Sequence, residues 1–290
     1  MTPSTTEMID GFSLGFKKRG QRLAGVKLQG DSGLFDEQLE DALPQISEFF
    51  QSRELTAWHA RKRQGFCRFL TIKKSFSQDG LLINFTSSSS QVNDFDQNAF
   101  KDLMIRILGD RLLGLVHTIN DDPGDRPITS EGEQQLLHGS DHIFEEVCGL
   151  RFRISLESFF QTNPSSAEKL YQKAMDYVFA STGSKPVVMD LFSGTGTISQ
   201  MLAQRSENKE VVGVELLPEA VEDARENARL NGFTDIQFFA ADVGHFILNH
   251  PQYKDQIDTI VLDPPRAGIA PKTLRKVMRL EALTHSLYLL

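Results

Sequence analysis

The sequence predicts an α/β fold in its second half, a parallel sheet covered by helices on both faces, preceded by a smaller α+β domain. Two observations carry this prediction. After residue 165, short apolar runs typical of buried strands alternate with segments of helical periodicity. Before that point, hairpin-like pairs of strands surround a helix, which indicates mixed strand pairing. We expect residues 1–150 to form the first domain and residues 151–290 the second.

The composition is that of a globular protein. Of 290 residues, 40% are hydrophobic and 24% charged, and no apolar run approaches the ~20 residues that cross a bilayer. The N-terminus lacks a basic start and an apolar stretch, so no secretory signal is expected. The two cysteines, Cys67 and Cys148, suit a reducing compartment and argue against a disulfide framework or a metal site. We expect a cytoplasmic protein with neither a bound metal nor a membrane partner.

The elements of the first domain follow from apolar spacing. Residues 65–75 and 80–88 are two strand-like runs joined by a short polar turn, which predicts a hairpin. Residues 97–110 carry apolar side chains at helical spacing, and residues 114–120 read as a strand. Residues 138–163 then predict short strands that turn at Gly149.

The second domain opens with a helix. Ser165 and Glu168 have the spacing of a capping box, and Leu170, Ala174 and Val178 share one face of the helix that follows. Four apolar runs then predict parallel strands, at 186–192, 210–216, 236–242 and 258–263. Between the second and third lies a helix with a proline in its first turn and an Asn-Gly stop, residues 218–232.

A glycine-rich turn follows the first of these strands. Gly194 and Gly196 stand where a helix begins, so the backbone there can approach a ligand closely. Gln200 and Met201 follow instead of a third glycine, which weakens a dinucleotide-binding interpretation. Taken alone, two glycines are also consistent with a tight turn of purely structural importance.

Acidic residues end all four predicted strands: Asp190, Glu215, Asp242 and Asp263. In open α/β sheets these ends line the ligand crevice, so we expect the four carboxylates to face it. Glu215 is placed to accept the ribose hydroxyls, and Asp242 to accept an adenine amine. Any single acid here could instead cap a helix. Because no phosphate-binding lysine motif is present, the acidic rim favours S-adenosylmethionine as cofactor.

The loop after the fourth strand has a stiff backbone. Asp263 precedes Pro264 and Pro265, and each proline fixes its own φ and restricts the preceding residue. Such a loop can hold a planar base beside a methyl donor. Amino-methyltransferases usually place an aromatic residue next, whereas Arg266 suits a phosphate or a carbonyl group.

These segments together resemble the RNA uracil-C5 methyltransferases, which make 5-methyluridine in ribosomal or transfer RNA. The matching segments are SFFQTN (158–163), DLFSGTGT (190–197), VVGVEL (211–216), ENARLNG (226–232), VLDPPRAGI (261–269), LGFKKRG (14–20) and GFCRFLTIKKS (65–75). The resemblance implies a Rossmann-like, S-adenosylmethionine-dependent methyltransferase sheet, C-terminally incomplete, after an RNA-binding domain. It also implies a set of cofactor-site residues: Gln161, Phe192, Gly194, Gly196, Glu215, Asp242 and Asp263. Asp263 and Arg266 would support catalysis, and Thr197 is a weaker candidate.

The catalytic cysteine of that family has no counterpart in this sequence. In the family a thiolate adds to C6 of uracil, and a base then removes the C5 proton. Residues 285–290 resemble the start of the fifth strand, so this cysteine is expected just after Leu290. Cys67 and Cys148 are expected to be structural, and no iron–sulfur cluster is expected. We therefore expect cofactor binding without a catalytic residue of the chain's own.

Positive charge is concentrated in the first domain. The cationic residues Lys17, Lys18, Arg19, Arg61, Lys62 and Arg63 are the candidates for RNA phosphate contacts. Trp58, Phe66 and Phe69 lie near them and are candidates for stacking on unpaired bases. The same pattern also suits a solvated charged face over core aromatics, and the family resemblance favours RNA.

Two alternatives stay open at this point. The DPP loop also suits an amino-methyltransferase acting on a purine base, which needs no cysteine. The chain could instead be a catalytically inactive RNA-binding or cofactor-binding remnant. Neither the target nucleotide, nor the RNA species, nor the oligomeric state follows from the sequence.

Overall fold

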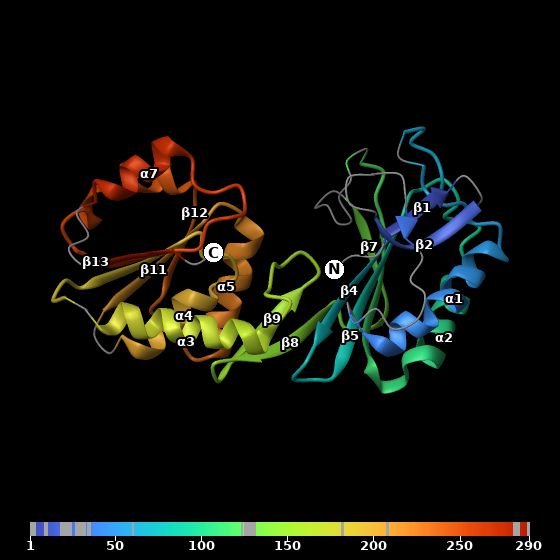
Figure 1. Cartoon of the computed structure of the whole chain (residues 1–290), viewed down its shortest axis with the longest axis horizontal. Helices are drawn as coiled ribbons and strands as arrows, with labels where there is room; N and C mark the ends of the chain where they lie inside the picture. The colour runs from blue at the N-terminus through green and yellow to red at the C-terminus, as the bar shows by residue number, and fades with distance from the viewer. Residues whose placement is uncertain are drawn as a thin grey trace. The chain divides into compact units, whose positions relative to one another are not determined.

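The chain forms two compact units, each built around its own sheet (Figure 1). The computed structural model describes residues 4–8, 11–17, 25–26, 33, 36–59, 61–122, 124, 132–180, 183–206, 209–280 and 285–288. The first unit is Met1–Ile143 with Ser155–Glu157, and the second is Phe144–Ile154 with Ser158–Leu290. The boundary predicted after residue 150 falls a few residues beyond this change of unit.

A seven-stranded mixed sheet forms the first unit. Its order is β3-β2-β1-β4-β5-β6-β7, in which β5 and β6 are parallel and the other described pairs antiparallel. The strands are β1 (Ser4–Met8), β2 (Gly11–Lys17), β3 (Gly25–Val26), β4 (Cys67–Ser75), β5 (Gly80–Ser87), β6 (Leu112–Ile119) and β7 (Glu133–Gly139). The predicted hairpin is confirmed, since Ser75 pairs with Gly80 across the turn between β4 and β5.

Two helices, α1 (Glu37–Gln51) and α2 (Gln97–Leu108), pack side by side on this sheet, and the short 3-10 helix η1 (Gly109–Arg111) follows α2 (Figure 1). α2 begins at the predicted residue. α1 was not predicted, and it contains a proline, Pro44. Aromatic rings fill the core between the helices and the strands; they are Phe49, Phe50, Phe66, Phe85, Phe95 and Phe100.

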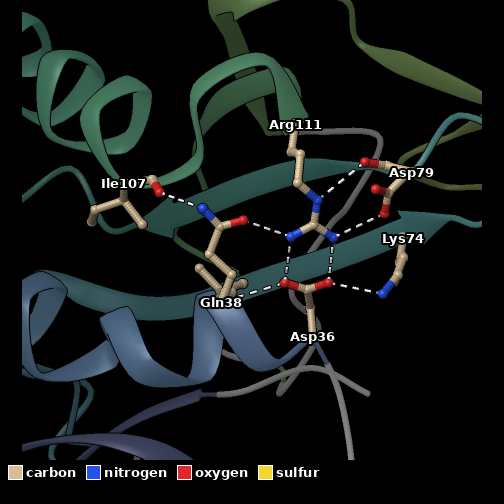
Figure 2. Close-up of polar contacts among 7 residues, drawn as sticks. Asp36, Gln38, Lys74, Asp79, Ile107 and Arg111 are labelled. Carbon is tan, nitrogen blue, oxygen red and sulfur yellow. Dashed lines mark hydrogen bonds and ion pairs between the residues drawn. The ribbon is translucent and has the colours of Figure 1, made fainter.

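The buried carboxylate of Asp36 joins three elements of the first unit (Figure 2). Its Oδ1 accepts from the backbone N–H of Leu39 at 3.3 Å, which caps α1. Arg111, from η1, donates to both carboxylate oxygens at 3.1 and 2.6 Å, and Lys74 of β4 donates to Oδ2 at 2.8 Å. Burial alone would raise the pKa of Asp36, but hydrogen bonds from Arg111 and Lys74 outweigh it and lower this pKa to about 2.

The second unit is a five-stranded, all-parallel sheet in the order β12-β11-β10-β13-β14. Its strands are β10 (Val187–Leu191), β11 (Glu210–Glu215), β12 (Gln237–Ala240), β13 (Ile257–Leu262) and β14 (His285–Tyr288). The four predicted strands and the fifth-strand start are thereby confirmed. Ahead of them, β8 (His142–Val147) and β9 (Leu150–Ser155) form a hairpin whose turn is at Cys148 and Gly149, as predicted.

Helices cover both faces of the parallel sheet, which confirms the doubly wound prediction (Figure 1). On one face, α3 (Pro164–Ala180) and α4 (Thr197–Arg205) pack on Val188, Val211 and Val261. On the other, α6 (Val243–Asn249), the 3-10 helix η2 (Pro251–Tyr253) and α7 (Pro271–Met278) pack on alternate residues of the same strands. α5 (Pro218–Leu230) begins at its predicted proline and ends at Asn231.

The capping box predicted at Ser165 and Glu168 is wrong. The helix begins two residues earlier, because Asn163 is the N-cap: its Oδ1 accepts from Ser166 N at 3.1 Å and its carbonyl from Ala167 N at 3.0 Å. Glu168 instead accepts from the backbone N–H of Cys148 at 2.6 Å. On the buried face, Tyr171 takes the place predicted for Leu170, whose side chain is exposed.

Among the described residues, no helix combines the length and apolar character needed to cross a bilayer.

The Asp36 cluster predicts a matched difference between two aspartates. Asp36→Asn should lower the free energy of unfolding of the first unit by about 2–4 kcal/mol, because it leaves Arg111 and Lys74 without their buried partner. Asp79→Asn removes the mostly exposed carboxylate 3.3 Å from Arg111 and should cost less than about 1 kcal/mol. Urea unfolding followed by the fluorescence of Trp58, the single tryptophan, measures both.

The wild-type stability should also depend on pH in a defined direction. Since the folded pKa of Asp36 lies below its ordinary value of 3.8, its contribution is present above pH ~4 and is lost as the pH falls towards 2. Asp36→Asn should lack this loss. Equal stability of Asp36→Asn and Asp79→Asn would contradict the assignment.

Candidate functional site

The register of the parallel sheet brings distant residues to one edge. Leu191, the last residue of β10, pairs with Val214 of β11 and with Leu262 of β13. Phe192, Glu215 and Asp263 follow these three positions in sequence, so they leave the sheet at its carboxyl edge. Parallel sheets bind ligands at this edge.

The turn from β10 into α4 is tight and partly strained. Phe192 adopts a positive φ of 71°, which non-glycine residues rarely do, and its N–H donates to Val214 O at 2.8 Å. Gly196 also has a positive φ, and a Cβ there would lie 2.9 Å from Phe238 Cζ and 3.0 Å from Ala224 Cβ. A Cβ on Gly194 would meet nothing within 4 Å. The two glycines therefore differ: Gly196 is required by packing, and Gly194 borders open space.

The side chain of Glu215 connects the turn after β10 with the turn after β11. Its Oε1 accepts from the backbone N–H groups of Leu216 and Leu217, at 2.8 and 3.1 Å, and its Oε2 from Gly194 N at 3.1 Å. A carboxylate offers about four acceptor positions, so about one is left for a ligand hydroxyl. The exposed side chains of Leu216 and Leu217 lie directly beyond it.

Asp190 was predicted to face the ligand crevice, and this prediction is wrong. It is the fourth residue of β10 and is fully buried, and its Oδ2 accepts from Ser199 Oγ of α4 at 2.6 Å. Its Oδ1 has no partner. Burial, with added repulsion from Asp263 and Glu215, raises the pKa of Asp190 to about 7. The strand-end pattern failed here because the last residue of the strand is Leu191.

Asp242 caps a helix, which was the alternative considered for each of the four strand-end acids. Its Oδ1 accepts from the backbone N–H of His245 at 2.9 Å, which caps α6. The side chain remains 49% exposed, so a second interaction with a ligand is open to it.

Tyr171 interacts electrostatically with Asp263 and Gln161, a grouping that the sequence did not reveal. Burial, followed by the charge of Asp263, raises the pKa of Tyr171, and a side-chain hydrogen bond with Gln161 opposes this shift. Burial also raises the pKa of Asp263. Tyr171 lies on the buried face of α3, and its place beside Ala167 and Ala174 is the signal that could have identified it. Beside Gln161, Phe159 is 74% exposed, an unusual position for a phenylalanine.

Asn227 of α5 and Asn231, the residue that follows α5, hold β9, the strand that leads to Gln161. Asn231 accepts from Arg151 N at 2.9 Å and donates to Arg151 O at 2.8 Å. Asn227 makes the same pair with Arg153, at 2.7 and 3.2 Å. Each amide thus pairs with one residue of β9, in the manner of a neighbouring strand. We call these two residues, Asn227 and Asn231, the asparagine clamp. Both belong to the ENARLNG segment, so the clamp explains structurally why this segment carries asparagine at these two positions.

Farther along the same segment, Ser158 donates a hydrogen bond to Asp223 of α5. Arg153 lies 3.6 Å from Asp223 and 3.5 Å from Glu226. One face of α5 therefore holds the chain from Arg151 to Ser158, three residues before Gln161.

Neither cysteine belongs to a strand of the parallel sheet. Cys67 is at the start of β4 in the first unit, is fully buried, and its thiol pKa is raised well above its ordinary value by burial. Cys148 adopts a positive φ in the β8–β9 turn, and burial followed by the charge of Glu168 raises its pKa. Both therefore favour the unreactive thiol form.

Part of the aromatic pattern predicted for base stacking belongs to the core. Phe66 is fully buried and Phe69 is 5% exposed, so their rings are not available to unpaired bases. Trp58 is half-buried, with the guanidinium of Arg68 4.5 Å from its ring centroid. The candidate cations Arg61, Lys62 and Arg63 are exposed, whereas Lys18, Arg19 and the side chain of Lys17 lie outside the described residues.

Comparison with known proteins identifies the fold and the family. A family model described as "Methyltransferase domain" matches residues 183–287, which hold the parallel sheet. An uncharacterized RNA methyltransferase of Clostridium tetani is 36% identical over 94% of this chain and 57% of its own length. One of Clostridium acetobutylicum is 37% identical over 86% of this chain and 52% of its own length.

The chain belongs to the RNA methyltransferase family. It spans about half the length of these two RNA methyltransferases.

The fold agrees with this assignment. The tRNA (uracil-54, C5)-methyltransferase of Pyrococcus abyssi, solved with S-adenosyl-L-homocysteine, superimposes with a TM-score of 0.68. The likeness covers 97% of this chain and 63% of that protein, at 23% identity. The second unit accordingly has the Rossmann-like methyltransferase fold that the sequence predicted.

The asparagine clamp predicts a local loss of protection. Asn227→Ala leaves the N–H and C=O of Arg153 without partners and should destabilise the second unit by about 2–4 kcal/mol. Asn231→Ala should cost less, because this side chain is less buried. Hydrogen exchange of the peptide covering residues 150–158 should accelerate in both variants. Arg229→Ala, an exposed change on the same helix, is the control, and equal exchange in all three would rule out the clamp.

Proposed function

We propose that this chain forms part of an enzyme that transfers a methyl group from S-adenosylmethionine to C5 of a uridine in ribosomal or transfer RNA. The observation that carries the proposal is the convergence of Glu215, Asp263 and the Gly194 turn on one edge of a methyltransferase sheet. The family supports RNA as the substrate, and the resemblance to uracil-C5 methyltransferases supports the pyrimidine target.

The residues at this edge fit a nucleoside cofactor. Open space over Gly194 admits a ligand close to the backbone, and Glu215 next to it retains an acceptor position for a ribose hydroxyl. Asp242 and the exposed Leu216 are suited to the polar edge and the flat face of an adenine. When bound, S-adenosylmethionine supplies an electrophilic methyl group.

The loop after β13 fits a pyrimidine base. Asp263 stands on a proline-stiffened stem, and its charge acts on Tyr171 of α3. A carboxylate and an amide together can pair with the imide edge of uracil, and the exposed Phe159 offers a ring for stacking.

We assign no nucleophile to the residues of this chain. Activation of C5 through a C6 adduct requires an accessible thiolate, and both Cys67 and Cys148 have raised thiol pKa values. The reaction product distinguishes the proposed activity from the two alternatives, an amino-methyltransferase and an inactive binding protein. Mass spectrometry of digested RNA after incubation with labelled donor would show 5-methyluridine for the proposed activity, a methylated purine for an amino-methyltransferase, and no product for an inactive binding protein.

Glu215 should control donor affinity. Glu215→Gln replaces the charged acceptor by a neutral amide, and we expect affinity for S-adenosylmethionine to fall by about 10- to 100-fold, or roughly 1.4–2.8 kcal/mol. Glu222→Gln makes the same substitution at an exposed position of α5 and should change affinity less than twofold. Titration calorimetry measures both. Unchanged affinity in Glu215→Gln, or no binding by the wild type, would contradict the cofactor assignment.

Substitutions of Gly194 and Gly196 should affect different properties: one donor binding, the other the stability of the second unit. Gly196→Ala forces a Cβ against Phe238 at a positive φ and should destabilise the second unit by about 2–4 kcal/mol. Gly194→Ala has room for its Cβ and should cost only about 1 kcal/mol for its φ, while weakening donor binding at least tenfold. Urea unfolding followed by circular dichroism, combined with calorimetry, tests the pair. Full donor affinity in Gly194→Ala would show that the ligand does not approach this turn.

A further inference from the structure

The segment that follows β13 is strongly basic. Residues 264–280 contain five cationic side chains and no acidic one, in a chain whose formal net charge is −8. The cations are Arg266, Lys272, Arg275, Lys276 and Arg279. Apart from Arg266, this segment was not among the residues that the sequence suggested for the site, and the cations suggested for RNA contacts all lie in the first unit.

Three of these cations form one stripe on α7 and the residue after it. Lys272, Arg275 and Arg279 are exposed and follow a spacing of three and four residues, which places them on one side of the helix. Buried Val277 and Leu280 attach the opposite side to the core shared with α6. Figure 1 shows α7 on the face of the sheet away from α3 and α4.

Among the described residues, the stripe has no carboxylate partner. In the described part of the chain, none of these three side chains makes an ion pair. Arg275 Nε donates only to Pro271 O within its own helix, at 3.2 Å. Three like charges along about 10 Å of helix repel one another unless an anion joins them.

The stripe lies close to the candidate site. Lys276 of α7 donates through Nζ to Gly244 O of α6 at 3.0 Å, and Asp242 at the carboxyl edge caps that same helix. Arg266 stands three residues after Asp263, in the loop that leads to α7. The cations therefore continue outward from the edge where the base would bind.

We propose that the α7 stripe, formed by Lys272, Arg275 and Arg279, binds backbone phosphates of the RNA strand next to the target nucleotide. This inference rests on the proposed function. The chemistry favours a polyanion, because three unpaired cations in a row match a strand with one phosphate per nucleotide. Their span of about 10 Å covers about three nucleotides at ~3.4 Å each. Met278, 75% exposed beside the stripe, offers apolar surface to a base.

The stripe variant Lys272→Gln/Arg275→Gln/Arg279→Gln tests this directly. Its matched control, Lys169→Gln/Lys173→Gln/Arg229→Gln, removes three exposed cations from α3 and α5. Fluorescence anisotropy with a labelled, uridine-containing single-stranded RNA is measured from 50 to 300 mM KCl. We expect the stripe variant to bind at least tenfold more weakly at 50 mM, and its slope of log K against log salt to fall by about 0.7 for each lost contact. The control should change less than twofold.

Three outcomes would overturn the proposal. In the first, the stripe variant binds RNA with wild-type affinity and salt slope. In the second, the wild type does not bind RNA. In the third, polyglutamate displaces the labelled RNA as well as unlabelled RNA does, which would indicate an acidic protein partner. Calorimetry with S-adenosylmethionine separates this result from the proposed function. The stripe variant should retain wild-type donor affinity and circular dichroism, whereas a wild type that binds no donor contradicts the proposed function itself.

Discussion

The candidate site depends on the burial of β10 in the middle of a parallel sheet. All five of its residues are buried, and its register with β11 and β13 is fixed by apolar contacts on both faces. Because the strands run in one direction, Phe192, Glu215 and Asp263 leave the sheet side by side despite the long stretches of chain between them. A shift in this register would separate the glycine turn from both acids.

The sheet alone does not complete the site, because Gln161 and Phe159 precede it in the sequence. The asparagine clamp supplies part of the attachment, because Asn227 and Asn231 pair with the backbone of β9, the strand that leads to this segment. Backbone groups of β9 that would otherwise lack partners are satisfied by side chains of α5. The asparagines of ENARLNG therefore hold β9, and Ser158, the first residue of SFFQTN, is held separately by Asp223.

The sequence predicted what depends on local pattern. Strand alternation, the glycine turn and the edge position of Glu215 follow from apolar periodicity and from glycine at a helix start. It did not predict features that depend on tertiary packing. Helix α1 was not predicted because Pro44 interrupts the helical pattern, and the N-cap of α3 was assigned to Ser165 although Asn163 is also a capping residue. Asp190 and the rings of Phe66 and Phe69 were misassigned, because residue type does not reveal which side of a buried strand a side chain takes.

The acids at the carboxyl edge also explain why a cationic ligand suits this site. Burial raises the pKa of Asp190 to about 7, with Asp263 and Glu215 adding repulsion, and burial also raises the pKa of Asp263. The ionised forms are therefore costly in the ligand-free protein. A nearby positive charge favours ionised carboxylates, so the sulfonium of the proposed donor would offset part of this cost. A neutral thioether product would not. Asp190 and Asp263 would thus favour the proposed donor over its product.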